Sequence, residues 1–597
     1  MNTSSRKSST LPGLALIGLA EILIFFRSPN HFFMGDTLRW FAVRYQSIGE
    51  FLAGFAHADS AAWYRPIAQC TVQSLLYPIV GFHPLAYRVV TFLLFFGCTV
   101  AVFRLVEQVT QSRNAAWFST IYFGSHITHA FTTFDVAFTP EIVFTLFYIG
   151  SAMAFVYFLR NPTRRSLVVS LALFICSLLS KETAVGLPFV LLAIWALLPE
   201  GHRPRVSSLA PHFVILAAYL LFAVGFIHIR EIHISDILNR PTEVGNPGYE
   251  LVLGQNILDS IRLAFTWAFN ISRGTNGQWP PSIPVMVTAL KVLRVLLCAG
   301  ALMTLFTPRR KFVLIGIAWF LIAAAPTLPL LAHFLPYYLF APVVGFSLAI
   351  GVVLDEIREQ ISRISPRAAW AICGAIVAIP VIVNANAADR VENTHFLLGD
   401  SARSALNTMN DVRALYPAIR PGTTLVFFNE ERGSLSWDLA YGMLLQMAYN
   451  DPSIKTEYSV DPISVTADDF LRGTALAFKL TYGRLQDFTP YVKQLPALLL
   501  AHAPDRQFRL ELPAQEVHFG DGEYGVRVPQ LSDTTVNALV AFNGILKEPF
   551  RIKFNKRGEG KVAITDATPP GLYTYVALQP VDEPNWVTVA GSLRLIP

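Results

Sequence analysis

The chain has 597 residues, of which 53% are hydrophobic and 15% are charged, whereas soluble proteins carry about 25% charged residues. These numbers exclude a disordered chain, a collagen and a coiled coil, and the clustered apolar residues predict a multi-pass membrane protein. The net charge is +6, but residues 1–389 hold 27 Lys+Arg against 18 Asp+Glu, and residues 390–597 hold 20 against 23. The basic excess belongs to the membrane part, where basic cytoplasmic loops explain it without a nucleic-acid partner.

Apolar runs of roughly 17–25 residues predict eleven spanning helices. Basic residues precede the first run and lie in the connections after the fourth, sixth, eighth and tenth runs, all on one side, which the positive-inside rule places in the cytoplasm. The N-terminus is then cytoplasmic and the C-terminal region is periplasmic or otherwise extracytoplasmic, and a bacterial inner membrane is the expected location. The predicted spans are about 10–27, 86–106, 115–131, 140–159, 166–180, 183–199, 211–228, 284–306, 312–331, 337–354 and 368–386.

The sequence predicts three domains. Residues 1–389 form the α-helical membrane bundle. Residues 390–506 mix apolar runs with helix-like stretches and predict a small soluble α/β domain, whereas short alternating segments over 507–597 predict a β-sandwich. The runs 66–80 and 256–270 are apolar but interrupted or flanked by polar groups, which is typical of helices that lie along the membrane interface.

The first predicted outer loop carries the candidate catalytic acid. It begins Met34-Gly35-Asp36-Thr37, so that Asp36 lies just beyond the first span, where a carboxylate can meet water and lipid headgroups together. Such a group suits a general base that takes a proton from a sugar or protein hydroxyl. The alternative is a helix N-cap, because Asp before an amphipathic stretch is a common start signal. Asp59 in the same loop is a candidate helper or a turn residue.

Two arginines lie where a lipid phosphate is expected. Arg65 belongs to Trp63-Tyr64-Arg65-Pro66, and Arg88 opens the second span. A guanidinium binds phosphate through paired donors, which makes both residues candidates for the donor phosphate. Interfacial anchoring by Trp, Tyr and Arg is the alternative.

The segment Ser180-Lys181-Glu182-Thr183 separates two apolar runs. Charged groups at membrane depth are costly, so they usually pair or serve function. Lys181 is the candidate for binding the donor phosphate and Glu182 for positioning the lysine. A plain outward turn with a snorkelling lysine is the alternative, although such a turn would normally contain Gly, Asn or Pro.

Further polar and aromatic residues cluster around the other outer connections. His126, His129, Asp135 and Glu141 could bind a divalent metal or an acceptor sugar, or be loop residues without a metal; no cofactor is otherwise expected. His126 and His129 are spaced i, i+3 and can share a helix face. His333, Tyr337 and Tyr338 enter a late span from the outside and either line the same cavity or form an aromatic belt.

The order of these segments resembles that of the GT-C membrane glycosyltransferases. An acid follows the first span, and after it come Tyr64-Arg65-Pro66, Ser180-Lys181-Glu182 and the Tyr-rich entry to the span containing Pro342. Within that superfamily the chain is similar to the protein O-mannosyltransferase branch, and to the membrane part of its tetratricopeptide-bearing members. The resemblance covers roughly residues 10–355. Many relatives have two adjacent acids where this chain has Asp36-Thr37, and the tetratricopeptide repeats are replaced here by a mixed and then β-rich tail.

The resemblance implies a glycosyltransferase that takes sugar from a polyprenyl- or dolichyl-phosphate donor, with Asp36 as the catalytic acid of the first outer loop. A lipid phosphate leaves readily once Lys or Arg matches its charge, so one carboxylate base and an in-line attack suffice, which predicts inversion. The acceptor is a glycan or a protein on the outer face of the membrane. The alternatives are a transporter or flippase of lipid-linked glycans, a polymerase or ligase that uses diphosphate-linked oligosaccharides, and a non-enzymatic scaffold.

Overall fold

The computed structural model separates the chain into two compact units, Met1–Arg403 and Ser404–Pro597. The residues that it describes are 10–27, 31–42, 47–53, 55, 64–68, 74–198, 204–222, 253–271, 283–330, 333–394, 396–428, 435–458, 467–481, 484–490, 508–509, 516–518, 523–528, 531–542, 545–546, 550–563, 571–581 and 587–596.

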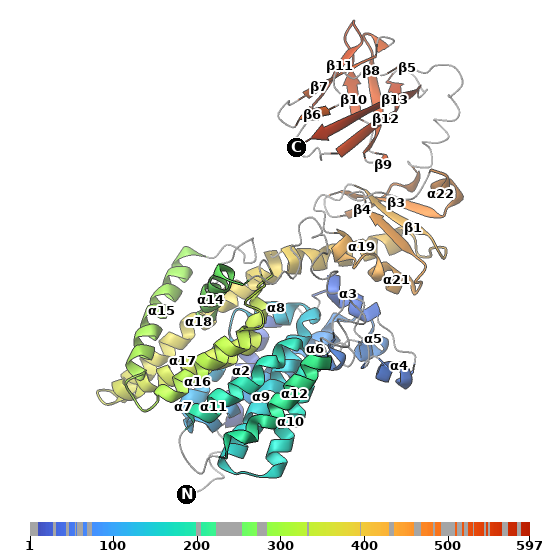
Figure 1. Ribbon diagram of the computed structural model, residues 1–597. Coiled ribbons are helices and arrows are strands. Elements are labelled where there is room, and N and C mark those ends of the chain that lie inside the picture. Colours follow the sequence, from blue (N-terminus) through green and yellow to red (C-terminus); the bar gives the residue numbers. More distant parts are fainter. Residues whose placement is uncertain are drawn as a thin grey trace. The chain divides into compact units, whose positions relative to one another are not determined.

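The first unit is a helical bundle around α17, whose residues from Phe340 to Glu356 are all buried. Helices α7, α9, α15, α16 and α18 contact α17, and Figure 1 shows α16 and α18 beside it. A helix that is apolar on every side is favoured in such a central position. The helices are α2 (Thr10–Phe25), α3 (Gly35–Ala42), α4 (Ile48–Ala53), α5 (Ser74–Val80), α6 (Pro84–Thr110), α7 (Arg113–Gly124), α8 (His129–Phe134), η3 (Val136–Phe138), α9 (Thr139–Arg160), α10 (Arg164–Leu178), η4 (Glu182–Gly186), α11 (Leu187–Leu197), η5 (Val206–Leu209), α12 (Ala210–Phe222), α14 (Gln255–Ala268), α15 (Pro284–Thr304), α16 (Arg310–Ala324), η7 (Pro336–Leu339), α17 (Phe340–Ser362), α18 (Pro366–Thr394) and the π-helix η8 (Phe396–Asp400).

The membrane part agrees with the sequence prediction in kind but not in span length. Five helical segments among the described residues are long and apolar enough to cross a membrane, and they match five of the eleven predicted spans. The other six predicted spans correspond to shorter helices, α2, α7, α10, α11, α12 and α16, of 11 to 16 residues. Eleven full spans are therefore not confirmed. Turns follow α7 and α16, and the 3₁₀ segment η4 precedes α11, at residues that the apolar pattern counted as helix.

Glycine lets α16 and α17 approach with backbone in contact. A Cβ atom on Gly316 would lie 2.5 Å from the carbonyl oxygen of Gly345, and one on Gly345 would lie 2.5 Å from Cβ of Trp319. Helices that pack in lipid commonly meet through such small residues. The contact fixes α17 against α16.

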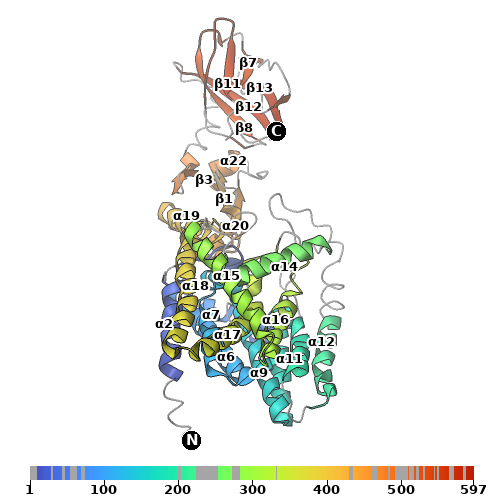
Figure 2. The ribbon, with the colours of Figure 1, turned by 90° about the vertical axis from the view of Figure 1, so that its left-hand side faces the viewer.

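Segments far apart in the chain close the bundle. Helix α2 at the N-terminus contacts α18 near the end of the unit, as Figure 2 shows. Just past the end of α2, Arg27 pairs with Asp389 of α18 at 2.9 Å. Helices α2 and α18 are thus held together.

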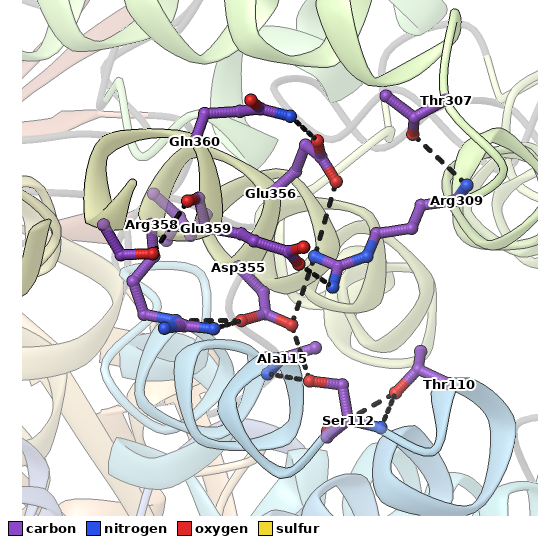
Figure 3. A network of polar contacts seen from close by, with 12 residues as sticks. Thr110, Ser112, Ala115, Thr307, Arg309, Asp355, Glu356, Arg358, Glu359 and Gln360 are labelled. Atoms are coloured by element: carbon purple, nitrogen blue, oxygen red, sulfur yellow. Dashed lines mark hydrogen bonds and ion pairs between the residues drawn. The ribbon is translucent and has the colours of Figure 1, made fainter. Parts of the chain in front are cut away.

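A charged network fills the end of the bundle where α17 ends (Figure 3). The guanidinium of Arg309 lies 3.3 Å from Asp355, 3.4 Å from Glu356 and 2.5 Å from Glu359. Asp355 is also paired with Arg358 at 2.9 Å. The basic residues around 309–311 and 363–367 lie at this same end of the helices, whereas Tyr337 and Tyr338 precede the other end of α17.

The second unit contains β-sheets and short helices. Its first sheet has the strand order β2-β1-β3-β4, with β1 parallel to β2 and β3. Its second sheet is mainly antiparallel, with the path β10-β8-β12-β13-β5, and a two-stranded sheet pairs β11 with β7. The elements are α19 (Ser401–Leu415, which begins in the first unit), β1 (Thr424–Phe428), α20 (Leu435–Asp438), α21 (Met443–Tyr449), β2 (Lys455–Tyr458), α22 (Ala467–Arg472), β3 (Ala475–Thr481), β4 (Arg484–Asp487), β5 (Phe508–Arg509), β6 (Glu516–His518), β7 (Glu523–Arg527), β8 (Thr535–Phe542), β9 (Ile545–Leu546), β10 (Phe550–Lys553), β11 (Glu559–Ala563), β12 (Gly571–Pro580) and β13 (Val587–Ile596).

Candidate functional site

Lys181 forms a buried ion pair with Glu141. Helix α10 ends at Leu178, and the extended backbone of Lys181 (φ −163°) leads into η4. Glu141 lies in the first turn of α9, so its carboxylate comes from a different helix. The two side chains are 3% and 2% exposed. A pair of this kind needs close contact, since desolvating two charges is expensive.

A second ion pair adjoins the first. The Nε and Nη2 atoms of Arg65 donate to the two carboxylate oxygens of Glu182 at 2.8 and 2.6 Å. This is the paired geometry in which guanidinium binds planar anions most tightly. The side chain of Arg65 is 10% exposed and that of Glu182 is 43% exposed. The Arg65–Glu182 pair therefore opens to solvent, whereas the Lys181–Glu141 pair does not.

Aromatic residues cover the lysine. The Lys181 ammonium lies 5.6 Å from the ring centre of Tyr337 and 5.0 Å from that of Tyr338, both within η7. These are cation–π distances. The hydroxyl of Tyr337 contacts Nε2 of His333 at 3.3 Å. Burial, together with the positive charge of Lys181, lowers the pKa of His333 to about 4, so the imidazole is neutral at pH 7.

Asp36 lies in the first turn of α3. Gly35 opens this helix with φ +45°, a left-handed conformation that glycine adopts readily. The Asp36 side chain is 46% exposed and lies 3.5 Å from Arg39. An accessible carboxylate in this position can accept a proton from a bound hydroxyl. Its place in the helix also fits the favourable interaction of an acid with a helix N-terminus.

Asp135 approaches α3 from the connection between α8 and η3. Its Oδ1 accepts hydrogen bonds from the hydroxyl of Thr37 at 2.6 Å and from the backbone N–H of Ala137 at 2.9 Å. Burial raises the pKa of Asp135 to about 6, and the nearby Asp36 charge adds to the shift while the two hydrogen bonds oppose it. The structure thus brings a second acid to Asp36, from about a hundred residues along the chain.

The short helix η3 connects the two halves of the site. Asp135 caps its start, and at its end the ring of Phe138 stacks on Tyr337 at 4.2 Å between centroids. Tyr337 in turn faces Lys181. The half that holds Asp36 and the half that holds Lys181 are therefore joined through one three-residue element.

Arg88 has other partners. Its Nη1 donates to the carbonyl of Thr133 at 2.5 Å and its Nη2 to the carbonyl of Phe25 at 2.6 Å. The side chain is buried, and the guanidinium lies over the ring of Phe26 at 4.8 Å. These contacts tie α6 to α2 and α8. The donor-binding role predicted for Arg88 stays a prediction.

The histidines predicted near the second outer connection are buried in the core. His126 contacts the Thr128 hydroxyl at 2.8 Å and the Ala268 carbonyl at 3.1 Å. His129 packs against aromatic rings, including Phe123 at 4.7 Å and Phe340 at 4.6 Å between centroids. Among the residues that the structure describes, no three His, Cys, Asp or Glu side chains gather as metal ligands would. The four residues proposed as a metal set are thus divided between the core and two separate polar clusters.

Two residues that contribute to the candidate site were not predicted from the sequence. Thr37 was seen only as a departure from a pair of acids, yet its hydroxyl holds Asp135. Phe138 gave no sequence signal, because an aromatic residue entering an apolar run is ordinary. Asp59 lies outside the described residues.

Part of the chain matches a known protein family. Residues 65–228 match the family described as dolichyl-phosphate-mannose-protein mannosyltransferase. A search of curated proteins gives no match.

Among solved structures, the chain is similar to the Archaeoglobus fulgidus oligosaccharyltransferase AglB, in complex with an inhibitory peptide and a dolichol-phosphate, at 14% identity and a TM-score of 0.42. That match covers 75% of this chain and 64% of AglB, just under two thirds. ArnT from Cupriavidus metallidurans, bound to undecaprenyl phosphate, is similar at 12% identity and a TM-score of 0.47, covering 85% of this chain and 96% of ArnT.

The family match begins at Arg65 and contains Glu141, Lys181 and Glu182. It therefore includes both ion pairs of the site but not Asp36. The resemblance predicted from Tyr64-Arg65-Pro66 and Ser180-Lys181-Glu182 is confirmed: over residues 65–228, the chain matches the dolichyl-phosphate-mannose-protein mannosyltransferase family.

Proposed function

We propose that the protein is a membrane glycosyltransferase that moves a sugar from a polyprenyl-phosphate donor to a glycan or protein acceptor, with inversion at the sugar carbon. The observation that carries the proposal is the buried Lys181 at the end of the bundle, covered by Tyr337 and Tyr338 and joined through η3 to the exposed carboxylate of Asp36. A lysine there can match the charge of a lipid phosphate as it leaves.

Asp36 acts as the general base in this proposal. It removes the proton of the acceptor hydroxyl while that oxygen attacks the sugar carbon, and the bond from that carbon to the phosphate oxygen breaks on the opposite side. The leaving phosphate keeps the electron pair of the broken bond. No acid is needed to protonate it, because a phosphate whose charge is matched by a cation is already a competent leaving group.

The test is Asp36→Asn in nanodiscs, with polyprenyl-phosphate mannose as the first donor and release of polyprenyl phosphate as the readout. Transfer is expected to fall by at least about 100-fold, as loss of a positioned base typically does, while donor binding holds or tightens. Asp389→Asn is the matched control, since Asp389 is equally exposed (48%) and is also paired with an arginine. Near-normal turnover of Asp36→Asn would refute Asp36 as the general base, and Asp135 would become the candidate for that role.

The orientation is part of the same proposal. The ends of the helices that carry Arg160, Arg164 and Arg309–Lys311 are opposite the ends near Glu141 and Lys181, and basic ends usually face the cytoplasm. Transfer then takes place on the outer face, and the second unit lies outside. A reporter that is active only in the cytoplasm, fused after Pro597, should give no signal, and a strong signal would reverse the orientation.

A further inference from the structure

In the structure, every positive charge of the Lys181 site is already neutralised. Lys181 is matched by Glu141, and Arg65 is matched by Glu182 through two hydrogen bonds. The four groups carry no net charge. Among the described residues of this site, an incoming lipid phosphate therefore finds no surplus cation unless one of the two carboxylates gives up its partner.

The two carboxylates differ in what happens to them after such an exchange. Glu182 is 43% exposed and is held by both of its oxygens, so water can solvate it if it moves. Glu141 is 2% exposed and is held to Lys181 by one oxygen. If the Lys181 ammonium turned to a phosphate, Glu141 would remain as a buried carboxylate without its counter-ion. Such a charge is too costly to keep, and the group neutralises instead.

We propose that Glu141 competes with the donor phosphate for Lys181 and takes up one proton when the donor binds. The proton comes from water, and it returns to water when the lipid phosphate leaves and the ion pair re-forms. This inference rests on the proposed function of the site, and it assigns to Glu141 a positioning role, because Glu141 acts through Lys181.

Other titratable groups face this pair, and the experiment separates them. Arg65 comes from the first outer loop, Glu182 from η4, and His333, Tyr337 and Tyr338 from the entry to α17. His333 is the one among these that could also gain a proton near neutral pH, since its ordinary value is close to 6.5. His333→Gln therefore accompanies the Glu141 variants.

The probe is a methyl phosphodiester of a C55 polyprenol, which keeps a single charge between pH 6 and pH 8. Binding to the full chain in detergent is measured by calorimetry in two buffers of different ionisation enthalpy, which gives the number of protons taken up. The wild type should take up about one proton per lipid, so that Kd rises by about tenfold for each pH unit. Glu141→Gln should take up none and should bind about tenfold more tightly at pH 8, and Glu141→Asp should restore the uptake.

Glu21→Gln is the matched control. Glu21 is a buried carboxylate of the bundle, 1% exposed, whose partner is the hydroxyl of Thr99 at 2.6 Å and not a lysine. This variant and His333→Gln should keep the uptake of the wild type. The inference is overturned if the wild type binds the probe without proton uptake, or if Glu141→Gln takes up as many protons as the wild type. Normal binding by Lys181→Ala would instead refute the role of Lys181 in the proposed function.

Discussion

Two charged clusters lie at the two ends of α17, and they balance their charges differently. Near its start, Lys181 and Arg65 are each matched by one carboxylate. Near its end, Arg309 contacts three carboxylates, and one of these also pairs with Arg358. An arginine shared among several acids can lose one contact and stay neutralised, whereas a one-to-one pair must exchange partners as a whole.

The clusters also differ in what surrounds them. Aromatic rings cover Lys181, while hydroxyl and amide groups surround the carboxylates of the other cluster. Ser112 donates to Asp355 at 2.6 Å and Gln360 donates to Glu356 at 2.6 Å (Figure 3). Along α17 the clusters are about 25 Å apart, at about 1.5 Å per residue. We therefore expect the first to govern substrate binding and the second to govern stability alone.

Lys181→Ala should have the largest effect. It leaves Glu141 without its counter-ion, and breaking a buried pair on one side costs about 3–5 kcal/mol of unfolding free energy. Donor binding should be lost in addition. Lys181→Arg keeps the charge with a different geometry and should retain part of both properties. Thermal unfolding in detergent and polyprenyl phosphate binding are the two measurements, and normal binding by the alanine variant would leave the lysine a structural role only.

Arg309→Gln should affect stability alone, and to a smaller degree. Arg309 is 28% exposed, and its carboxylate partners keep Arg358, Ser112 and Gln360 nearby, so the expected loss is about 1–2 kcal/mol. The donor concentration at half-maximal transfer should match that of the wild type. A shift of that concentration without a change in thermal stability would mean that the two clusters are coupled. The cluster around Arg309 would then not govern stability alone.

Asp135→Asn should have the smallest effect, visible as a change in pH dependence. The folded pKa of about 6 lies above the ordinary 3.8, so between these values the folded protein binds more protons than the unfolded one. Stability from this group is present at low pH and falls as pH rises from about 4 to 6. Melting temperatures at pH 4.5 and 6.5 should therefore differ less in Asp135→Asn than in the wild type. An equal difference in both proteins would exclude Asp135 as its source.

The sequence located the charged groups of the site but not their pairing. Ser180-Lys181-Glu182 was visible because charge between two apolar runs is costly. That Lys181 meets Glu141 and Glu182 meets Arg65 depends on how α9, α10 and residues 64–68 pack, which no local pattern encodes. Glu141 was grouped with the histidines for its position in the chain, and the turn between α7 and α8 placed those histidines in the core instead.

For the helical bundle, the sequence predicts which helices exist and in what order, but not how long they are. The apolar runs gave the existence and order of the helices, because burying or embedding them requires residues of that kind. Their lengths were not predictable, since 3₁₀ segments such as η4 and η7 run directly into the helices that follow them. These segments carry Glu182, Tyr337 and Tyr338, so the part of the fold that was hardest to read is also the part that forms the site.

The shortness of α10 has a consequence for the lipid around the protein. Its 15 residues rise about 22 Å, while the hydrocarbon core of a bilayer is about 30 Å thick. With Arg164 at one polar boundary, the helix ends several ångström short of the other. The bilayer adjusts to such a mismatch by thinning locally. We expect a thinned membrane to lower the headgroup layer toward the end of α10 and the residues that follow it, so that under the proposed function the phosphate of a lipid donor meets this site while its chain stays among its neighbours.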